Sequence, residues 1–374
     1  MPAGSDARDW LRLTLTPGIG GETQRKLLAA FGLPERILAT DAGTLAGVIG
    51  PKAAERLLTT DTREAVDAAL AWAEIPGQQI VTLADDDYPP ALLELPDPPT
   101  LLYVRGRREL LARISAHPAI AIVGSRNATP QGEANARAFA GALAEAGYCI
   151  VSGLALGIDA AAHRGALAAA GDTIAVIGTG ADRLYPARNR ELATEIADKG
   201  LIVSEFPLGT PAAAANFPRR NRLISGLSQG VLVVEAAVES GSLITARLAG
   251  EQGREVFAIP GSIHSPQSRG CHRLIRQGAK LVETAQDILE ELAPGRPAAS
   301  CTMAPGPVDT AADSDETARL LNCTGYDPVT IDELATRSGL TADALSVILL
   351  QLELDGRVAS LPGGRYQRLA EQHP

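Results

Sequence analysis

The sequence predicts an α/β protein built on an extended, doubly wound Rossmann-like sheet, with a helical domain before it and a winged helix after it. Three observations support this class. Glycine-rich turns separate short helical patterns at the start of the chain, short apolar runs alternate with helical patterns through the middle, and a helix-helix-helix-hairpin pattern ends it. The predicted boundaries are 1–75 for the helical domain, 76–293 for the sheet domain, 294–315 for a linker and 316–374 for the winged helix.

Two similar turns mark the first domain. The stretches LTPGIGGETQRKLLAAFG (15–32) and LAGVIGPKAAERLL (45–58) each place a glycine turn before a helix that carries a Leu-Leu pair. This pattern is typical of helix-hairpin-helix, or SAM-like, domains, whose turn amides can bind a phosphate because a helix N-terminus favours anions. A small helical packing domain that binds nothing is the equal alternative.

The middle segment contains continuous rather than alternating apolar runs, which are typical of strands buried on both faces. Their alternation with helical patterns predicts parallel strands joined by crossover helices. The predicted strands are 119–123, 148–151, 173–177, 201–204, 230–234, 255–258 and 279–282, and the predicted helices include 130–146, 157–170 and 188–199. The preceding stretch, rich in Pro and Asp, contains one further strand, LLYVRG at 101–106, which we expect at the edge of the sheet.

The end of the chain predicts a linker followed by a winged helix. Residues 293–315 are mainly Pro, Ala, Ser and Asp without a period, which indicates a flexible linker. A helix from Ile331, a turn at 338–340, a helix capped by Thr341 and a hairpin around 362–364 follow. The stretch 341–355 carries no basic residue, so we expect this module to contact protein rather than duplex DNA.

Composition limits the classes of function. The formal net charge of −10 argues against a generally basic nucleic-acid binder, but residues 117–290 carry 16 charges of each sign, so a nucleic-acid surface would be a local patch there. The four cysteines form no CxxC pair, which predicts free thiols and no metal site. No apolar run approaches the roughly 18 residues of a membrane span and no signal pattern opens the chain, so we expect a cytoplasmic protein without a membrane partner.

The turn after the first predicted strand of the middle segment carries Gly124, Ser125 and Arg126. Glycine lets the backbone approach a ligand, serine offers a hydroxyl and an amide, and the guanidinium fork of arginine suits a phosphate. The positive end of the following helix is expected at the same place. We therefore predict anion binding at this turn, with a surface salt bridge of Arg126 as the alternative.

The next two turns add polar groups at the same edge of the predicted sheet. Ser152 and Gly153 end the second strand, and Asp159 and His163 follow on one helix face, four residues apart. A hydrogen bond between Asp159 and His163 that fixes the turn is the favoured interpretation, and a catalytic or metal-binding pair is the alternative. The third turn contributes three further side chains, those of Arg183, Tyr185 and Arg188.

The stretch NFPRRNRLISGLSQGVLVVEA (216–236) places an aromatic ring beside three arginines, and its candidate residues are Phe217, Arg219, Arg220, Asn221 and Arg222. Cations that follow phosphates and a ring that stacks on a base are what a single-stranded nucleic-acid groove needs. In the alternative, the ring is core and the arginines pair with acids such as Glu205. A later turn offers small residues and free amides to a phosphate, or is only a capped helix; it consists of Ser240, Gly241 and Ser242.

Six motifs follow one another over about 117–282, namely IVGSRNATPQG, VSGLALGIDAAAH, FPRRNRLISGLS, SGSLITARLA, IPGS and GCHRLIRQGA. Together and in this order they resemble the DprA/Smf family of DNA-processing proteins. The resemblance implies a non-enzymatic homodimer that binds and protects single-stranded DNA and loads the recombinase RecA onto it in natural transformation. It also implies that Arg126 and residues 217–222 line the DNA groove. Family members can carry a basic residue shortly before the phenylalanine, whereas 212–215 is Ala-Ala-Ala-Ala here.

The alternative functions are enzymatic. Related Rossmann-like folds include nucleotide phosphoribohydrolases of the lysine-decarboxylase-like family, whose motif contains a catalytic glutamate. The corresponding stretch, ESGSLITARLA, has no glutamate after the threonine, so general acid–base catalysis has no evident agent. The dinucleotide fingerprint GxGxxG is absent, so no cofactor is expected. A nuclease would need a metal-binding carboxylate cluster, which the sequence does not show.

Overall fold

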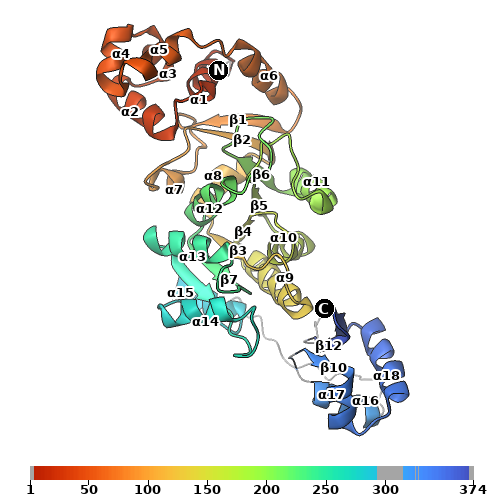
Figure 1. The fold of residues 1–374 in the computed structure, drawn as a ribbon. Coiled ribbons are helices and arrows are strands. Elements are labelled where there is room, and N and C mark those ends of the chain that lie inside the picture. The colour runs from red at the N-terminus through yellow and green to blue at the C-terminus, as the bar shows by residue number, and fades with distance from the viewer. Residues whose placement is uncertain (1–3, 293–314, 325, 327, 370–374) are drawn as a thin grey trace.

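The computed structural model describes residues 4–292, 315–324, 326 and 328–369, and it confirms the predicted α/β class (Figure 1). A nine-stranded sheet forms the middle of the described chain, and short helices precede it in the sequence. A separate three-stranded sheet with three helices forms the end. All but the last residue of the predicted linker, 294–315, lies outside the described residues. Within the described part of the chain, no helix has both the length and the apolar character needed to cross a bilayer.

Six helices precede the sheet, and both predicted glycine turns are present between them. Gly18 and Gly50 each adopt a φ of 81°, which lies in the left-handed region that glycine tolerates. The apolar side chains that face inward from these helices form one core of their own, which includes Leu13, Ile19 and Leu27. The helices are α1 Gly4–Leu15, α2 Gly21–Phe31, α3 Pro34–Ala39, α4 Ala42–Ile49, α5 Pro51–Thr59 and α6 Arg63–Ala73.

The large sheet is wound in both directions from its centre. Its strand order is β1-β2-β6-β5-β4-β3-β7-β8-β9, so the chain moves outward from β3 on one side and continues from β7 on the other. Strands β3 to β9 pair in parallel, as predicted. The strands are β1 Gln78–Thr82, β2 Leu101–Gly106, β3 Ala119–Val123, β4 Cys149–Ser152, β5 Thr173–Val176, β6 Leu201–Ser204, β7 Gly230–Val233, β8 Glu255–Ala258 and β9 Lys280–Leu281.

The predicted edge position of 101–106 is wrong. This strand, β2, lies between β1 and β6 and pairs antiparallel with both. The edge is instead β1, which pairs with β2 along its whole length. Strand β1 was not predicted because its first two residues are glutamines, which are only partly buried.

Helices cover both faces of the sheet, so the side chains of a central strand alternate between two cores. In β3, Ile120 and Ile122 pack with residues of α9 and α10, whereas Ala121 and Val123 pack with residues of α12 and α13. These helices and their neighbours are α7 Pro90–Leu93, α8 Glu109–Ala116, α9 Pro130–Glu145, α10 Ile158–Ala168, α11 Arg190–Lys199 after the short 3-10 helix Ala187–Asn189, α12 Asn216–Gly226, α13 Ser242–Glu251, α14 Arg269–Arg276 and α15 Ala285–Leu292.

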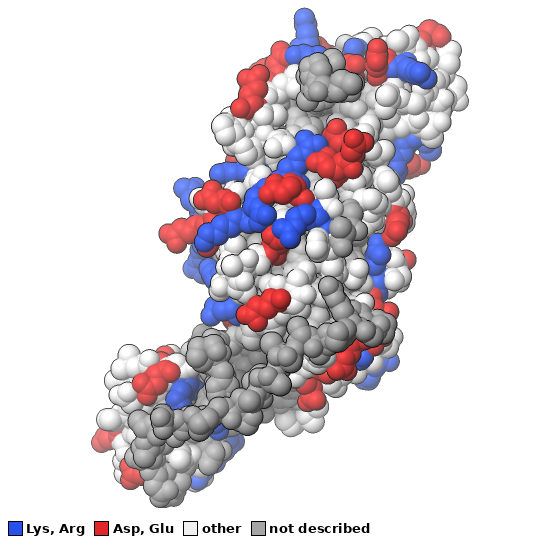
Figure 2. Space-filling model, turned by 180° about the vertical axis from the view of Figure 1, so that it is seen from behind, with Lys and Arg blue, Asp and Glu red and all other residues white. Residues whose placement is uncertain are grey.

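Charges of both signs are mixed on the surface of the sheet domain. Figure 2, the view from behind, shows basic and acidic side chains next to one another over the middle of the molecule. Ion pairs contribute to this mixing. The carboxylate of Asp172, for example, forms ion pairs with Arg107 at 2.9 Å and with Arg113 at 2.7 Å. A phosphate would therefore meet local groups of free cations rather than a broadly basic face.

The last segment has the winged-helix order of elements. Thr330 and Glu333 form a capping box at the start of α17, Gly339 ends that helix in the left-handed conformation, and Thr341 caps α18 as predicted. The predicted hairpin connects β11 and β12. The elements are α16 Asp315–Thr324, β10 Val329–Thr330, α17 Ile331–Ser338, α18 Ala342–Leu354, β11 Val358–Leu361 and β12 Arg365–Arg368.

The close packing of α9 on α10 depends on Gly165. A Cβ atom at this position would overlap the carbonyl oxygen of Arg137 and lie 3.0 Å from Cβ of Ala140. We expect Gly165→Ala to lower the free energy of unfolding by about 1–3 kcal/mol, because the two helices must separate. Urea denaturation followed by circular dichroism measures this change.

The matched control is Gly47→Ala on α4, where no atom lies within 4 Å of the added methyl group. This substitution is expected to be neutral or to stabilise the protein by about 0.5–1 kcal/mol, because alanine loses less entropy than glycine in a helix. Equal effects of the two substitutions would contradict the packing argument.

Candidate nucleic-acid interface

A cavity of 720 Å³ opens at the carboxyl ends of β3 and β7, where the strand order reverses. Ligands of doubly wound sheets bind at this topological position, because the two loops diverge there. The turn after β3, the turn before α13 and one face of α12 line the cavity. Of the residues predicted from the sequence, it brings together Gly124, Ser125, Arg126, Phe217, Arg220, Asn221, Ser240, Gly241 and Ser242.

An exposed cation and two aromatic rings meet at the mouth of this cavity. The guanidinium carbon of Arg126 lies 5.1 Å from the ring centroid of Phe217, within cation–π distance. The ring of Tyr185, which is 47% exposed, lies 5.8 Å from the same ring. Tyr185 was predicted in the third turn but not as a residue of the site. The three side chains offer a charge and two flat faces at one place.

The turn after β3 is held by its own backbone contacts. The amide of Ser125 donates to the carbonyl oxygen of Glu235 at 2.7 Å, and the hydroxyl of Ser125 accepts from the amide of Asn127 at 3.1 Å. A Cβ atom on Gly124 would come within 2.6 Å of Cγ1 of Ile158. Glycine is therefore required here by packing against α10, rather than by close approach of a ligand as we had expected.

We predicted that the positive end of α9 would be available to a ligand at this turn, and this prediction is wrong. A carboxylate of the protein occupies that end of the helix. Glu235 accepts hydrogen bonds from the amide of Thr129 at 2.9 Å and from its hydroxyl at 2.6 Å. Burial raises the pKa of Glu235, and the two bonds from Thr129 offset part of the rise. Glu235 was missed in the sequence, although its position directly after an apolar strand placed it at this edge of the sheet.

The start of α13 remains more open than the start of α9. Its N-cap is Gly241, which makes no side-chain cap, and no atom lies within 4 Å of the position that a Cβ there would take. The hydroxyls of Ser240 and Ser242 lie 2.7 Å apart, and Asn221 reaches the carbonyl oxygen of Gly241 at 3.4 Å. This turn therefore presents hydroxyls and a helix N-terminus to the cavity, which suits an anion.

Arg220 forms the floor of the cavity as a buried charge with 4% of its surface exposed. Its Nη1 donates to the carbonyl oxygens of Gly153, at 2.6 Å, and of Val176. A side chain on Gly153 would overlap the guanidinium group, so this glycine makes room for the arginine. Burial lowers the pKa of Arg220 to about 10, and nearby Asp159 opposes that shift. The side chain thus stays charged at neutral pH.

The favoured hydrogen bond between Asp159 and His163 is wrong. The carboxylate of Asp159 accepts from the amides of Gly153 at 3.1 Å and Ala155 at 3.3 Å, whereas Nδ1 of His163 lies 2.7 Å from the hydroxyl of Thr173. The two side chains share a helix face but turn to different partners. Among the described residues there is no group of His, Cys, Asp and Glu side chains that could hold a metal ion.

Four predicted residues do not line the cavity, namely Ser152, Gly153, Arg219 and Arg222. Ser152 is fully buried and its hydroxyl donates to the carbonyl oxygen of Ile122 at 2.6 Å, so the prediction that it binds DNA is wrong. Arg222 pairs with Glu205 and, at 3.0 Å, with Asp97, and Arg219 pairs with Glu205 at 3.3 Å. Helical spacing explains the division, because positions 217, 220, 221 and 224 share one face of α12 and positions 219 and 222 share another.

Comparison with known proteins identifies the family of the chain. The family model of DNA recombination-mediator protein A matches residues 79–293, and the model of the DprA winged helix domain matches residues 304–364. Protein Smf of Escherichia coli is 41% identical over 372 residues, which cover 97% of this chain and 96% of that protein. The chain belongs to the DprA/Smf family.

Solved structures of the DprA/Smf family share its fold. DprA from Streptococcus pneumoniae is 40% identical, with a TM-score of 0.66 over 76% of this chain and 97% of that one. DNA processing protein A from Helicobacter pylori, whose structure was described for its single-stranded DNA binding mode, is 34% identical, with a TM-score of 0.51 over 57% of this chain and 95% of that one.

His163 gives the fold of this DprA/Smf chain a specific acid sensitivity. Burial lowers its pKa to about 3, against an ordinary value of 6.5. As the pH falls below 6.5, the unfolded chain therefore binds a proton that the folded chain does not, and stability is lost until about pH 3. Between pH 6.5 and about pH 3, the free energy of unfolding should depend less on pH in His163→Gln, by up to about 1.4 kcal/mol per pH unit.

Urea denaturation at a series of pH values measures this slope for the wild type and the variant. The control is His264→Gln, since His264 is exposed and its substitution should leave the slope as in the wild type. Parallel pH profiles for the wild type and H163Q would contradict a buried, neutral His163.

Proposed function

We propose that this chain binds single-stranded DNA in the cavity at the carboxyl ends of β3 and β7, and that it does so as a non-enzymatic mediator of recombination. The observation that carries the proposal is the position of Arg126 over the ring of Phe217, with the charge of Arg220 fixed below them. Cations near a flat aromatic face hold a phosphate backbone and an unpaired base together.

The exposed ring of Tyr185 and the half-buried ring of Phe217 favour a single strand over a duplex. A base can stack on Phe217 or Tyr185 only if its own faces are free, which holds for unpaired nucleotides. Arg126 at the rim and the open start of α13 supply contacts to the phosphates on either side. These groups bind through features common to all nucleotides, so we expect little sequence preference.

Loading of RecA, protection of incoming DNA and homodimer formation rest on family membership. The relatives are described as a recombination-mediator protein and as DNA processing proteins, and one neighbour was described for its single-stranded DNA binding. We propose that this chain delivers bound strands to RecA as a homodimer in natural transformation. The contribution of the winged helix to protein contact, expected from the lack of basic residues on α18, stays a prediction.

A phosphoribohydrolase is the alternative function. Two carboxylates lie close to the cavity, but Asp159 accepts from the amides of Gly153 and Ala155, and Glu235 accepts from Thr129. These contacts favour structural roles for both acids over general acid–base catalysis. Release of adenine from AMP by the purified protein, abolished in Arg126→Ala, would support the enzyme instead.

The first test of DNA binding is Arg126→Ala. Fluorescence anisotropy of labelled oligo(dT) is measured at several salt concentrations, and we expect the affinity of the variant to fall at least about five-fold, which corresponds to about 1 kcal/mol for a charge-assisted contact. The dependence of affinity on salt should also become shallower, by about 0.7 in logarithmic slope for one lost phosphate contact.

The matched control is Arg164→Ala, which removes an exposed arginine from α10. It should leave both the affinity and the salt dependence unchanged. Salt-insensitive binding by the wild type, or equal losses in the two variants, would count against the proposed site.

A second test separates base stacking from phosphate contact through Phe217→Leu. Loss of the ring should weaken binding by about 1–3 kcal/mol per stacked base, whereas the salt dependence should stay as in the wild type because no counterion is released. The same anisotropy titrations provide both values. Phe217→Tyr serves as the control and should bind normally, and an unaltered affinity of Phe217→Leu would rule out stacking on this ring.

A further inference from the structure

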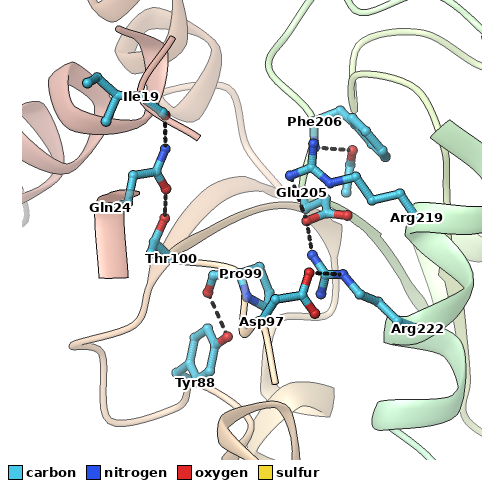
Figure 3. Close-up of polar contacts among 11 residues, drawn as sticks. Ile19, Gln24, Tyr88, Asp97, Pro99, Thr100, Glu205, Phe206, Arg219 and Arg222 are labelled. Atoms are coloured by element: carbon cyan, nitrogen blue, oxygen red, sulfur yellow. Dashed lines mark hydrogen bonds and ion pairs between the residues drawn. The ribbon is translucent and has the colours of Figure 1, made fainter. Parts of the chain in front are cut away.

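A second cavity, of 750 Å³, lies on the other side of α12, between the N-terminal helices and the sheet domain. We call it the junction cavity. Its walls are the turn between α1 and α2, the segment 97–101 before and within β2, and residues 205–207 after β6. Figure 3 shows how side chains from these three regions converge, with Arg219 and Arg222 reaching in from α12.

A buried side chain of α2 connects the N-terminal wall of the junction cavity to the sheet domain. Nε2 of Gln24 donates to the carbonyl oxygen of Ile19 at 2.8 Å, and its Oε1 accepts from the hydroxyl of Thr100 at 2.6 Å (Figure 3). Gln24 is buried, so the two bonds are shielded from water. The glycine turn of the first hairpin is thereby held at the rim of the cavity.

This rim offers groups that suit a phosphate. The N-cap of α2 is Gly20, which provides no side-chain cap, so the first amides of the helix are left for another acceptor. The side chain of Arg25 lies over this end of α2, with Nη1 3.0 Å from the position that a Cβ on Gly21 would take. On the opposite rim, the side chain of Arg219 is 55% exposed. The nearby acid Glu22 is paired with Lys26 at 2.8 Å.

The floor of the junction cavity carries buried polar atoms without partners. The side chains of Glu205 and Arg222 are only 2% and 9% exposed, and Tyr103 is 2% exposed. Among the described residues, Oε1 of Glu205, Nη1 of Arg222 and the hydroxyl of Tyr103 have no hydrogen-bond partner. Buried polar groups in native proteins are normally paired with protein, water or a ligand. The residues that carry this acceptor, this donor and this hydroxyl all line the junction cavity, so a group bound there can supply their partners.

We propose that the junction cavity binds a nucleotide of the same single strand, with its base edge against Glu205, Arg222 and Tyr103 and its phosphate between Arg219, Arg25 and the start of α2. Every base carries hydrogen-bonding groups on its Watson–Crick edge, which can meet the unpartnered atoms of the floor once the base is unpaired. This inference rests on the proposed function and extends its site to the helix-hairpin-helix turn.

The two cavities are connected by α12 itself. Phe217 and Arg220 line the first cavity, whereas Arg219 and Arg222 line the junction cavity, and all four belong to the first two turns of the helix. A strand that leaves the first cavity across the exposed Pro218 and Arg219 therefore reaches the second. A helix with its side chains is about 10–12 Å across, and a strand must span this width to reach both cavities. An oligonucleotide that only fills the first cavity therefore cannot occupy the junction cavity as well.

The test is a length series of labelled oligo(dT), from about 4 to about 20 nucleotides, titrated against the wild type, Arg25→Ala and Arg219→Ala. For the longest strands we expect each variant to bind about five-fold more weakly, with a salt slope shallower by about 0.7. For the shortest strands both variants should bind as the wild type does. Both positions lie at the rim, and Arg36→Ala on α3 serves as the control.

The outcomes separate this inference from the proposed function. If Arg126→Ala weakens binding at all lengths while Arg25→Ala and Arg219→Ala follow the wild type at every length, the junction cavity is overturned and the first site stands. If Arg126→Ala has no effect but the two rim variants still weaken long strands, the first site fails and the junction cavity is supported. Absence of binding at every length would overturn both.

A change in the ligand tests the base contacts of the floor. A long oligo(dT) is compared with one of the same length in which the nucleotides at one end, or at the other, are abasic. We expect one of the two abasic strands to lose most of the affinity gained by lengthening, because its phosphates remain but its base edges are gone. Full affinity of both abasic strands would overturn the base pocket.

Discussion

The buried charge of Arg220 is the constraint on which the rest of the site depends. An arginine taken out of water must find hydrogen-bond acceptors, and the carbonyl oxygens of Gly153 and Val176 supply them at the ends of β4 and β5. Gly153 must lack a side chain to admit the guanidinium, and Asp159 holds the backbone of the same turn while it balances the charge. With Arg220 fixed in this way, the rotation of α12 about its axis is fixed, and so is the direction in which every other residue of the helix points.

Much of the fold followed from the sequence because the central strands are buried on both faces. Such strands appear as continuous apolar runs, and the strands from β3 to β9 lie within a residue or two of their predicted ranges. The antiparallel end of the sheet was harder to predict. The half-polar β1 lacks a strong pattern, and its pairing with β2 depends on a contact between distant segments. Because β1 was not predicted, the strand 101–106 had no predicted partner on one side and was placed at the edge.

Most residues of the site were predicted from the sequence, but the cavity that each of them faces was not. In the sequence, Arg219, Arg220 and Arg222 look equivalent, and only the packing of α12 shows that one is buried under the first cavity and two turn toward Glu205. The pair Asp159 and His163 was predicted by spacing alone, whereas the hydroxyl of Thr173, at the start of β5, decides where the imidazole turns. The role of Glu235 at the start of α9 likewise depends on an element about a hundred residues away in the chain.

The two-sided character of α12 restricts how this part of the gene can vary. One inserted residue turns the remainder of a helix by about 100°. An insertion between Phe217 and Arg222 would thus point guanidinium groups into the apolar core. It would also bring leucine or isoleucine to the surface of the first cavity and of the junction cavity. The exposed alanines at 212–215, which precede the helix, face no such restriction. Their number can change without turning α12, whereas the seven codons for 216–222 must keep theirs.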